Sequence, residues 1–178
     1  MQALLSPRLS DRPSVYDASP GRGCDFLRPG FYFPNDGATG NGLMIDLSLI
    51  VLTWNTRELV LGCLEQLERE VRRTSGLQVE IWVVDNGSQD GTAQAVRARF
   101  PDVHLLALPE NVGFAAGNNA ALAEVKGRVV CLINSDVLIT HDALSRCVRV
   151  FGEMPDVGVA GLQLLHPDGR PQNSIHVF

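Results

Sequence analysis

Apolar residues follow two alternating patterns along most of this chain of 178 residues. Short continuous apolar runs, typical of strands buried in a parallel sheet, alternate with stretches in which apolar residues recur every three to four positions, as on one face of a helix. From residue 47 onward this alternation predicts an α/β fold with a mostly parallel sheet and helices packed on it. The expected strands are residues 47–53, 80–84, 103–108, 128–133 and 157–165.

Four helices are predicted between these strands, each from a local signal. Asn55 can cap the first helix, and the second begins at Asp90-Gly91-Thr92. An alanine-rich helix is expected over residues 113–125, and Thr140 can cap a fourth. After the last strand, Pro167-Asp168-Gly169-Arg170 supplies turn-forming residues and predicts a hairpin.

Residues 1–43 differ from the rest of the chain because they show neither the strand period of 2 nor the helical period of 3.6. Pro, Gly, Ser, Asp and Arg are spread through this segment. We interpret them as a disordered leader, with residues 44–178 forming the folded domain. Met44 directly precedes the first strand, so a natural start at Met44 is an alternative hypothesis to a start at Met1. N-terminal sequencing of the expressed protein distinguishes the two, because Met1 or Gln2 at the terminus removes the Met44 start.

Composition limits the class of protein. A hydrophobic content of 45% suits one domain with a sizeable core. We expect neither a membrane helix, which needs about 20 apolar residues, nor a secretion signal. We therefore expect a cytoplasmic protein, which is compatible with peripheral attachment to a membrane. The net charge of -5 argues against broad binding of nucleic acid. The cysteines lack zinc or disulfide spacing and are expected to be reduced, the last three buried: Cys24, Cys63, Cys131 and Cys147.

Three of the expected strands end in polar residues. The first runs into Trp54-Asn55, the second into Asp85-Asn86-Gly87-Ser88, and the strand over residues 128–133 into Asn134-Ser135-Asp136. The carboxyl ends of adjacent parallel strands border one crevice, where such folds bind ligands. A further cluster, residues 111–119, places amides and glycines at a helix start, which attracts phosphate and permits close approach to the backbone. Together these residues predict a ligand site.

The chemistry of these clusters has two interpretations, which the residues alone leave open. Asp, Asn, Ser and Gly also suit turns and helix caps that bind nothing. In the functional interpretation, Asp85 accepts a hydrogen bond from the N3–H of uracil or thymine, and Asp136 binds Mg2+ or Mn2+. These ions commonly take one or two protein carboxylates together with substrate phosphates. The cation would neutralise charge on a departing diphosphate.

The order and spacing of four motifs resemble those of the family 2 glycosyltransferases, in a rhamnosyltransferase-like branch that has Asn-x-Asp in place of Asp-x-Asp. The similarity covers Leu47 to about Ser174. It implies a GT-A-like three-layer α/β/α sandwich, the nucleotide-diphospho-sugar transferase fold. It also implies binding of a nucleoside-diphosphate sugar and a divalent cation, then inverting transfer to a hydroxyl of a saccharide or lipid-linked acceptor. The motifs are residues 50–55, 83–92, 111–113 with 117–119, and 132–136.

The resemblance also assigns residues. Thr53 and Asn55 match first-strand positions near the nucleoside, and Asp85 matches the acid that reads the pyrimidine of a UDP- or dTDP-sugar. Asp136 matches the ligand of Mg2+ or Mn2+, and Asn134 takes the leading position of the same motif, near the ribose and sugar. The other expected donor-binding residues are Gly87, Asn111, Gly113 and Asn118, the last of which stands where many relatives carry arginine.

No catalytic base is assigned, because in the family it is an acidic residue of a later segment and this chain stops at Phe178. We therefore expect residues 44–178 to be the donor-binding part of a glycosyltransferase of polysaccharide biosynthesis. The alternative is a truncated or noncatalytic nucleotide-sugar-binding module. A nucleotidyltransferase ranks lower, because residues 53–57 are not a glycine-rich, basic signature. Three acidic residues of the C-terminal part are expected at the surface: Glu153, Asp156 and Asp168.

Overall fold

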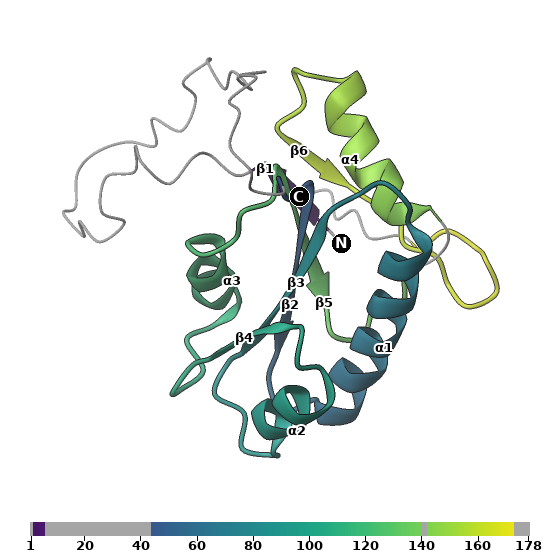
Figure 1. Cartoon of the computed structure of the whole chain (residues 1–178). Coiled ribbons are helices and arrows are strands. Elements are labelled where there is room, and N and C mark those ends of the chain that lie inside the picture. Colours follow the sequence, from purple (N-terminus) through teal and green to yellow (C-terminus); the bar gives the residue numbers. More distant parts are fainter. Residues whose placement is uncertain (1, 6–43, 140–141, 173–178) are drawn as a thin grey trace, which may run out of the picture. The chain divides into compact units, whose positions relative to one another are not determined.

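The computed structural model describes residues 2–5, 44–139 and 142–172. Strands and helices alternate from residue 47 onward, as the apolar pattern predicted (Figure 1). The elements in chain order are β1 (Gln2–Leu5), β2 (Leu47–Thr53), α1 (Arg57–Arg73), β3 (Val79–Asp85), α2 (Thr92–Arg99), β4 (His104–Ala107), α3 (Phe114–Leu122), β5 (Val129–Asn134), α4 (Ala143–Glu153) and β6 (Val159–Gly161).

The described strands form one sheet in the order β4-β3-β2-β5-β1-β6. β2 lies at its centre and pairs in parallel with β3 on one side and β5 on the other, while β4 pairs in parallel with β3. β1 runs antiparallel to both of its neighbours, β5 and β6. The prediction of a mostly parallel sheet is therefore confirmed.

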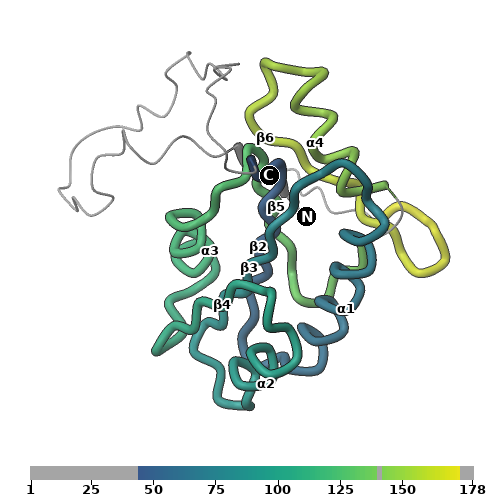
Figure 2. Tube along the Cα trace, viewed as in Figure 1, coloured from purple at the N-terminus to yellow at the C-terminus, as the bar shows by residue number. Residues whose placement is uncertain are grey.

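Helices cover both faces of the sheet, with α3 on one side and α1 and α4 on the other (Figure 1). Figure 2 follows the same path as a tube, with α2 next to α1. Successive side chains of a strand point to opposite faces, so in β2 Leu49 and Val51 join the α1 side of the core while Ile50 joins the α3 side. Burial on both faces explains why the strands read as continuous apolar runs.

The starts of two helices differ from the expectation. The N-cap of α1 is Thr56, so the prediction that Asn55 caps this helix is wrong. Asn55 instead adopts the left-handed conformation, with φ of 52°, and its side chain bonds another loop. Thr140, the expected cap of α4, lies outside the described residues, and the N-cap of that helix is Asp142.

The two ends of the chain also need correction. Gln2–Leu5 form a strand, so the prediction of disorder is wrong for these four residues, and the rest of the expected leader lies outside the described residues. β6 covers only Val159–Gly161, a shorter strand than expected. The predicted turn is present, because the His166 N–H donates to the Arg170 carbonyl at 2.8 Å and Leu165 pairs with Pro171.

The expectation of buried, reduced thiols is confirmed for Cys63, Cys131 and Cys147, while Cys24 lies outside the described residues. Burial, and to a smaller extent the negative charge of Asp136, raises the pKa of the Cys63 thiol to about 12. The Asp136 carboxylate therefore lies close enough to α1 to interact electrostatically with Cys63. Within the described ranges, no helix is long and apolar enough to cross a membrane.

Candidate functional site

The three polar strand ends lie next to each other because their strands are neighbours in register. Thr53, the last residue of β2, is opposite Asp85, the last residue of β3. On the other side of β2, Leu52 is opposite Asn134, the last residue of β5. The structure therefore brings together the three clusters that we expected to border a crevice at the carboxyl edge of the sheet.

Asp85 is a buried carboxylate with a free oxygen. It is 3% exposed, and Thr53 beside it is 2% exposed. Its Oδ1 accepts a hydrogen bond from the Ser88 N–H at 3.2 Å. Its Oδ2 forms no hydrogen bond with the residues that the structure describes. Asp85 thus offers one acceptor to a ligand at the end of β3.

Asn55 joins the loop after β2 to the loop after β3. Its backbone N–H donates to the Ser88 hydroxyl at 2.8 Å, and its Oδ1 accepts from the Gln89 N–H at 2.8 Å. Two residues further on, the Arg57 N–H donates to Asp90 at 3.1 Å. A hydrogen bond from the Thr92 hydroxyl lowers the pKa of Asp90, which keeps this acceptor charged. The two loops are therefore fixed to each other.

Asn86 fixes the loop that precedes α3. Its side-chain nitrogen donates to Asn111 Oδ1 at 2.9 Å and to the Gly113 carbonyl at 3.3 Å, and its Oδ1 accepts from the Val112 N–H at 3.0 Å. This residue belongs to a motif that we identified, but it was not among the expected site residues. The signal was the amide-bearing residue directly after β3, although its partners lie about 25 residues further along the chain.

Gly87 is required by both conformation and space. Its φ of 76° is left-handed, and a Cβ at this position would come within 2.5 Å of the Glu110 carbonyl carbon. The loop after β3 and the loop before α3 therefore touch through their backbones. Gly113, with φ of 87°, makes the turn that starts α3. Gly87 lies two residues after the end of β3, and Gly113 directly precedes α3.

Asn118 is held within its own helix. It is buried, and its side-chain nitrogen donates to the Phe114 carbonyl at 2.8 Å. The close approach of α3 to the sheet occurs one residue earlier, where a Cβ on Gly117 would lie 2.7 Å from Leu52 Cδ1. Of the expected donor-binding residues, Asn118 thus uses one of its two amide N–H donors within its own helix.

The Asn134-Ser135-Asp136 turn follows β5 and exposes its two outer side chains. The Val137 N–H donates to the Asn134 carbonyl at 3.1 Å, which closes the turn. The Asp136 carboxylate forms neither a hydrogen bond nor an ion pair with a described residue. Among these residues there is also no group of three or more His, Cys, Asp or Glu side chains that could hold a metal. A single exposed carboxylate fits Mg2+ or Mn2+, which take their other ligands from phosphates and water.

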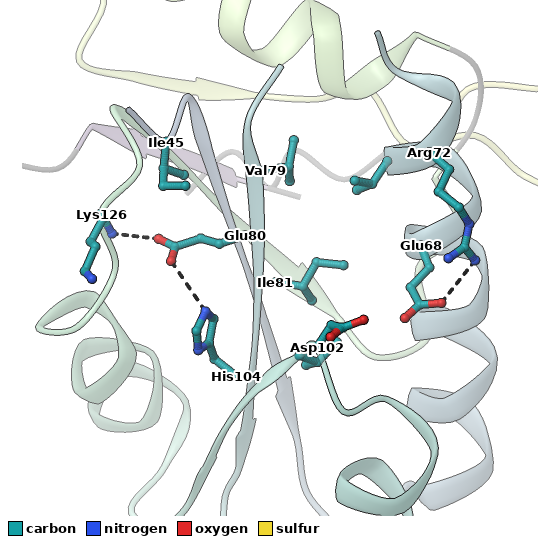
Figure 3. Close-up of a pocket in the computed structure, with 11 residues that line it drawn as sticks. Ile45, Glu68, Arg72, Val79, Glu80, Ile81, Asp102, His104 and Lys126 are labelled. Atoms are coloured by element: carbon teal, nitrogen blue, oxygen red, sulfur yellow. Dashed lines mark hydrogen bonds and ion pairs between the residues drawn. The ribbon is translucent and has the colours of Figure 1, made fainter. Parts of the chain in front are cut away.

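The pocket in Figure 3 lies elsewhere. It has a volume of about 510 Å3 and is lined by Glu80 and Ile81 from the start of β3 and by His104 from the start of β4. None of the expected site residues lines it. Its Glu80 carboxylate accepts hydrogen bonds from the Lys126 N–H at 2.6 Å and the Ser48 hydroxyl at 2.5 Å. These contacts tie the amino ends of the strands together, opposite the strand ends that carry Thr53 and Asp85.

Comparison with known proteins identifies the family. The family model described as Glycosyl transferase family 2 matches residues 48–177, which is most of the chain. The chain belongs to glycosyltransferase family 2. This result confirms the resemblance drawn from the motifs and favours a glycosyltransferase over a nucleotidyltransferase.

Curated relatives of this glycosyltransferase family 2 chain include two named proteins. The succinoglycan biosynthesis protein ExoO of Rhizobium meliloti is 30% identical over 128 residues, which cover 70% of this chain and 35% of ExoO. The N-acetylglucosaminyl-diphospho-decaprenol L-rhamnosyltransferase of Mycobacterium tuberculosis is 31% identical over 102 residues, covering 51% of this chain and 33% of that enzyme. The chain thus spans about a third of the length of these relatives.

Solved structures confirm the GT-A fold. The mannosyltransferase PcManGT of Pyrobaculum calidifontis, in complex with GDP-Man and Mn2+, is 29% identical with a TM-score of 0.51, over 59% of this chain and 32% of that one. Staphylococcus aureus TarS, in complex with UDP-GlcNAc, is 27% identical with a TM-score of 0.53, over 61% of this chain and 32% of that one. These family members bind nucleotide sugars, and PcManGT binds a divalent metal with its donor.

Proposed function

We propose that residues 44–178 form the donor-binding part of a cytoplasmic, inverting glycosyltransferase. The domain binds a UDP- or dTDP-sugar with Mg2+ or Mn2+ and transfers the sugar to a hydroxyl of a saccharide or lipid-linked acceptor, in polysaccharide biosynthesis. The observation that carries this proposal is the register of β3, β2 and β5, which sets Asp85, Thr53 and the Asn134–Asp136 turn side by side. The donor complexes of PcManGT and TarS and the names of the curated relatives support it.

Each end of the donor has a residue that suits it. Asp85 Oδ2 is free to accept the N3–H of a uracil or thymine ring, while Oδ1 is kept in place by Ser88. Asp136 would hold the divalent cation, which when bound supplies positive charge for the leaving diphosphate. Asn55 and Gly87 keep the loops around the nucleoside in position, and the backbone of the loop at Asn111 and Gly113 approaches the donor. Asn134 lies beside Asp136, on the sugar side.

Exchange of one atom in Asp85 tests the pyrimidine assignment. Asp85→Asn keeps the oxygen that bonds Ser88 and turns Oδ2 into an N–H donor, which repels the N3–H of uracil and suits the N3 acceptor of cytosine. We expect wild-type protein to bind UDP or dTDP better than CDP, and Asp85→Asn to weaken UDP binding about 10-fold or more and to reverse the preference. Calorimetric titration with Mn2+ measures both. Asp156→Asn, a change in an exposed loop, is the control, and unchanged UDP binding by Asp85→Asn would contradict the assignment.

The alternative is a noncatalytic nucleotide-sugar-binding module. It depends on whether any acidic residue of the C-terminal part can act as the catalytic base. Glu153, Asp156 and Asp168 are exposed, as expected, and none belongs to the strand ends that carry the site. Inverting transfer needs a carboxylate that deprotonates the acceptor hydroxyl on the face opposite the leaving diphosphate. Release of UDP or dTDP from a panel of donor sugars separates the two functions. Turnover supports the enzyme, and Mn2+-dependent binding without transfer or donor hydrolysis supports the binding module.

A further inference from the structure

Thr56 uses its hydroxyl in an unusual way. It is the N-cap residue of α1, a position where a Thr side chain commonly accepts a hydrogen bond from a backbone N–H of the first helical turn. Thr56 makes no such cap bond. Its hydroxyl oxygen instead lies 2.8 Å from Thr53 Oγ1 and 3.2 Å from Ser135 Oγ. The side chain therefore connects other elements rather than stabilising its own helix.

This chain of three hydroxyls spans the candidate site. At one end is Thr53, which is buried at the end of β2 and opposite Asp85 in the sheet. At the other end is Ser135, the middle residue of the turn that carries Asp136, 79 residues away from Thr56. Each hydroxyl can both donate and accept, so the two bonds can form together. Thr56 is thus the side chain that joins the pyrimidine end of the site to the turn proposed for the cation.

Helix α1 also holds the segment after this turn. The Cys63 thiol lies 3.6 Å from the Val137 carbonyl, and Gln66 exchanges two hydrogen bonds with the backbone of Ile139, at 2.7 and 3.0 Å. These contacts fix the segment beyond Asp136. Within the described residues, the contact between Thr56 and Ser135 is the only side-chain hydrogen bond to the Asn134-Ser135-Asp136 turn.

We propose that Thr56 is a positioning residue for donor binding, which acts through Ser135 to hold the Asp136 carboxylate at a set place relative to Thr53 and Asp85. The inference rests on the proposed function and deepens it by naming a residue that couples the two ends of the donor site. A group that orients a metal ligand typically changes metal affinity by about 10- to 100-fold when it is removed. The effect of Thr56 therefore falls on the metal-dependent part of nucleotide binding.

The test compares Thr56→Val, which removes the hydroxyl at nearly constant shape, with Thr56→Ser, which keeps it. Calorimetry measures the affinity for UDP and dTDP with and without MnCl2, and the ratio of the two affinities is the Mn2+-dependent gain. We expect Thr56→Val to reduce this gain about 10-fold or more and Thr56→Ser to restore it to within about 2-fold. Thr74→Val, at the other end of α1, is the matched control and keeps the full gain, because among the described residues its hydroxyl bonds only the Glu70 carbonyl.

A purely structural role gives a different result. Loss of stability would weaken binding with and without Mn2+ alike and leave the gain unchanged, and that outcome overturns the proposal. Ser135→Ala removes the same contact from the other side, so it provides the test if Thr56→Val does not fold. The two substitutions together should cost no more than one of them, since they break one connection. Additive losses contradict the inference. If wild-type protein shows no Mn2+-dependent binding of UDP or dTDP, the proposed function itself fails and the role of Thr56 fails with it.

Discussion

Asn55 shows how one residue can look like a helix cap and serve a different purpose. Asn and Thr both suit an N-cap, so the sequence offered two adjacent candidates at positions 55 and 56. The choice depends on Ser88 and Gln89, which bond the backbone and side chain of Asn55 across the gap between two loops. Asn also tolerates the left-handed conformation found here better than most residues. Contacts over more than 30 residues cannot be predicted from local spacing.

The strand-end residues were predictable because their positions follow from strand geometry. Once β2, β3 and β5 are neighbouring parallel strands, Thr53, Asp85 and Asn134 must lie at one edge. The role of Asn86 was not predictable in the same way, because its partners Asn111 and Gly113 belong to a loop whose course the motifs do not specify. The motif identified the region, and only the fold assigned the contacts.

Gly87 provides a residue-scale prediction with a matched control. Gly87→Ala places a methyl group against the Glu110 backbone, whereas Gly76→Ala introduces the same left-handed strain where nothing lies within 4 Å. We expect Gly76→Ala to lower the free energy of unfolding by about 1–2 kcal/mol, the cost of a left-handed alanine. Gly87→Ala should cost about 1–3 kcal/mol more, because the neighbouring loop must move.

Urea unfolding measures both costs, and calorimetry with UDP and MnCl2 measures the consequence for the site. The displaced loop in Gly87→Ala should weaken nucleotide binding about 10-fold, which equals about 1.4 kcal/mol, while Gly76→Ala binds as the wild type does. Equal stability of the two variants would show that the contact with Glu110 imposes no constraint.

At the scale of elements, β2 and β5 were predictable because burial on both faces makes each of them a nearly continuous apolar run. β4 is only partly buried and was predicted from its short apolar segment. β1 was not predictable, because residues 2–5 become a strand only by pairing with β5 and β6, which lie more than 120 residues further along the chain. β6 was predicted too long for a related reason. Its apolar segment continues to residue 165, but pairing with β1 covers only three residues.

Glu80 joins elements at the amino end of the sheet. Its carboxylate bonds Ser48 of β2 and the Lys126 N–H before β5, and Ser48 in turn accepts from the Gly127 N–H at 2.8 Å. Burial acts to raise the pKa of Glu80, but the bonds from Lys126 and Ser48 outweigh it, so the pKa lies below its ordinary value of 4.5. A lowered carboxyl pKa contributes stability that is complete above the unfolded pKa and is lost as pH falls through the folded value.

Glu80→Gln removes this charge and keeps one acceptor oxygen. We expect it to lower the free energy of unfolding by about 1–2 kcal/mol near pH 7, because hydrogen bonds to a charged group are the stronger kind. The difference from wild type should narrow as pH falls below 4.5, where the wild-type carboxyl gains its proton. Urea titrations across this range measure it. Glu153→Gln, in an exposed pair with Arg149, should change stability by less than about 0.5 kcal/mol. A constant difference at all pH values would exclude Glu80 as the source.

At the scale of the whole molecule, the two edges of the sheet have different tasks. The amino ends of the strands carry the Glu80 contacts, which hold elements together. The carboxyl ends carry Asp85 and the Asn134–Asp136 turn. Asp85 Oδ2 and the Asp136 carboxylate form no hydrogen bond with the described residues. This separation follows from the parallel arrangement of the strands, because their carboxyl ends lie at one edge of the sheet and their amino ends at the other. The alternation of strand and helix patterns could predict the fold class, whereas the contacts within the site depend on the order of the strands.

The net charge of the chain makes the cation central to the account. At a formal charge of -5, the protein offers a diphosphate little overall attraction, and in the proposed function Mn2+ or Mg2+ at Asp136 supplies the positive charge. The most direct measurement is calorimetric titration of UDP and dTDP into wild-type, Asp136→Ala and Asp156→Ala protein, with and without MnCl2.

Wild type and the exposed-loop control Asp156→Ala should bind at least one of the two nucleotides about 10-fold or more tightly with Mn2+, and Asp136→Ala should lose that gain while remaining folded. An Asp136→Ala variant that keeps the full Mn2+-dependent affinity would contradict the assignment of the cation to the turn after β5, and wild-type protein that binds neither nucleotide would contradict the donor site.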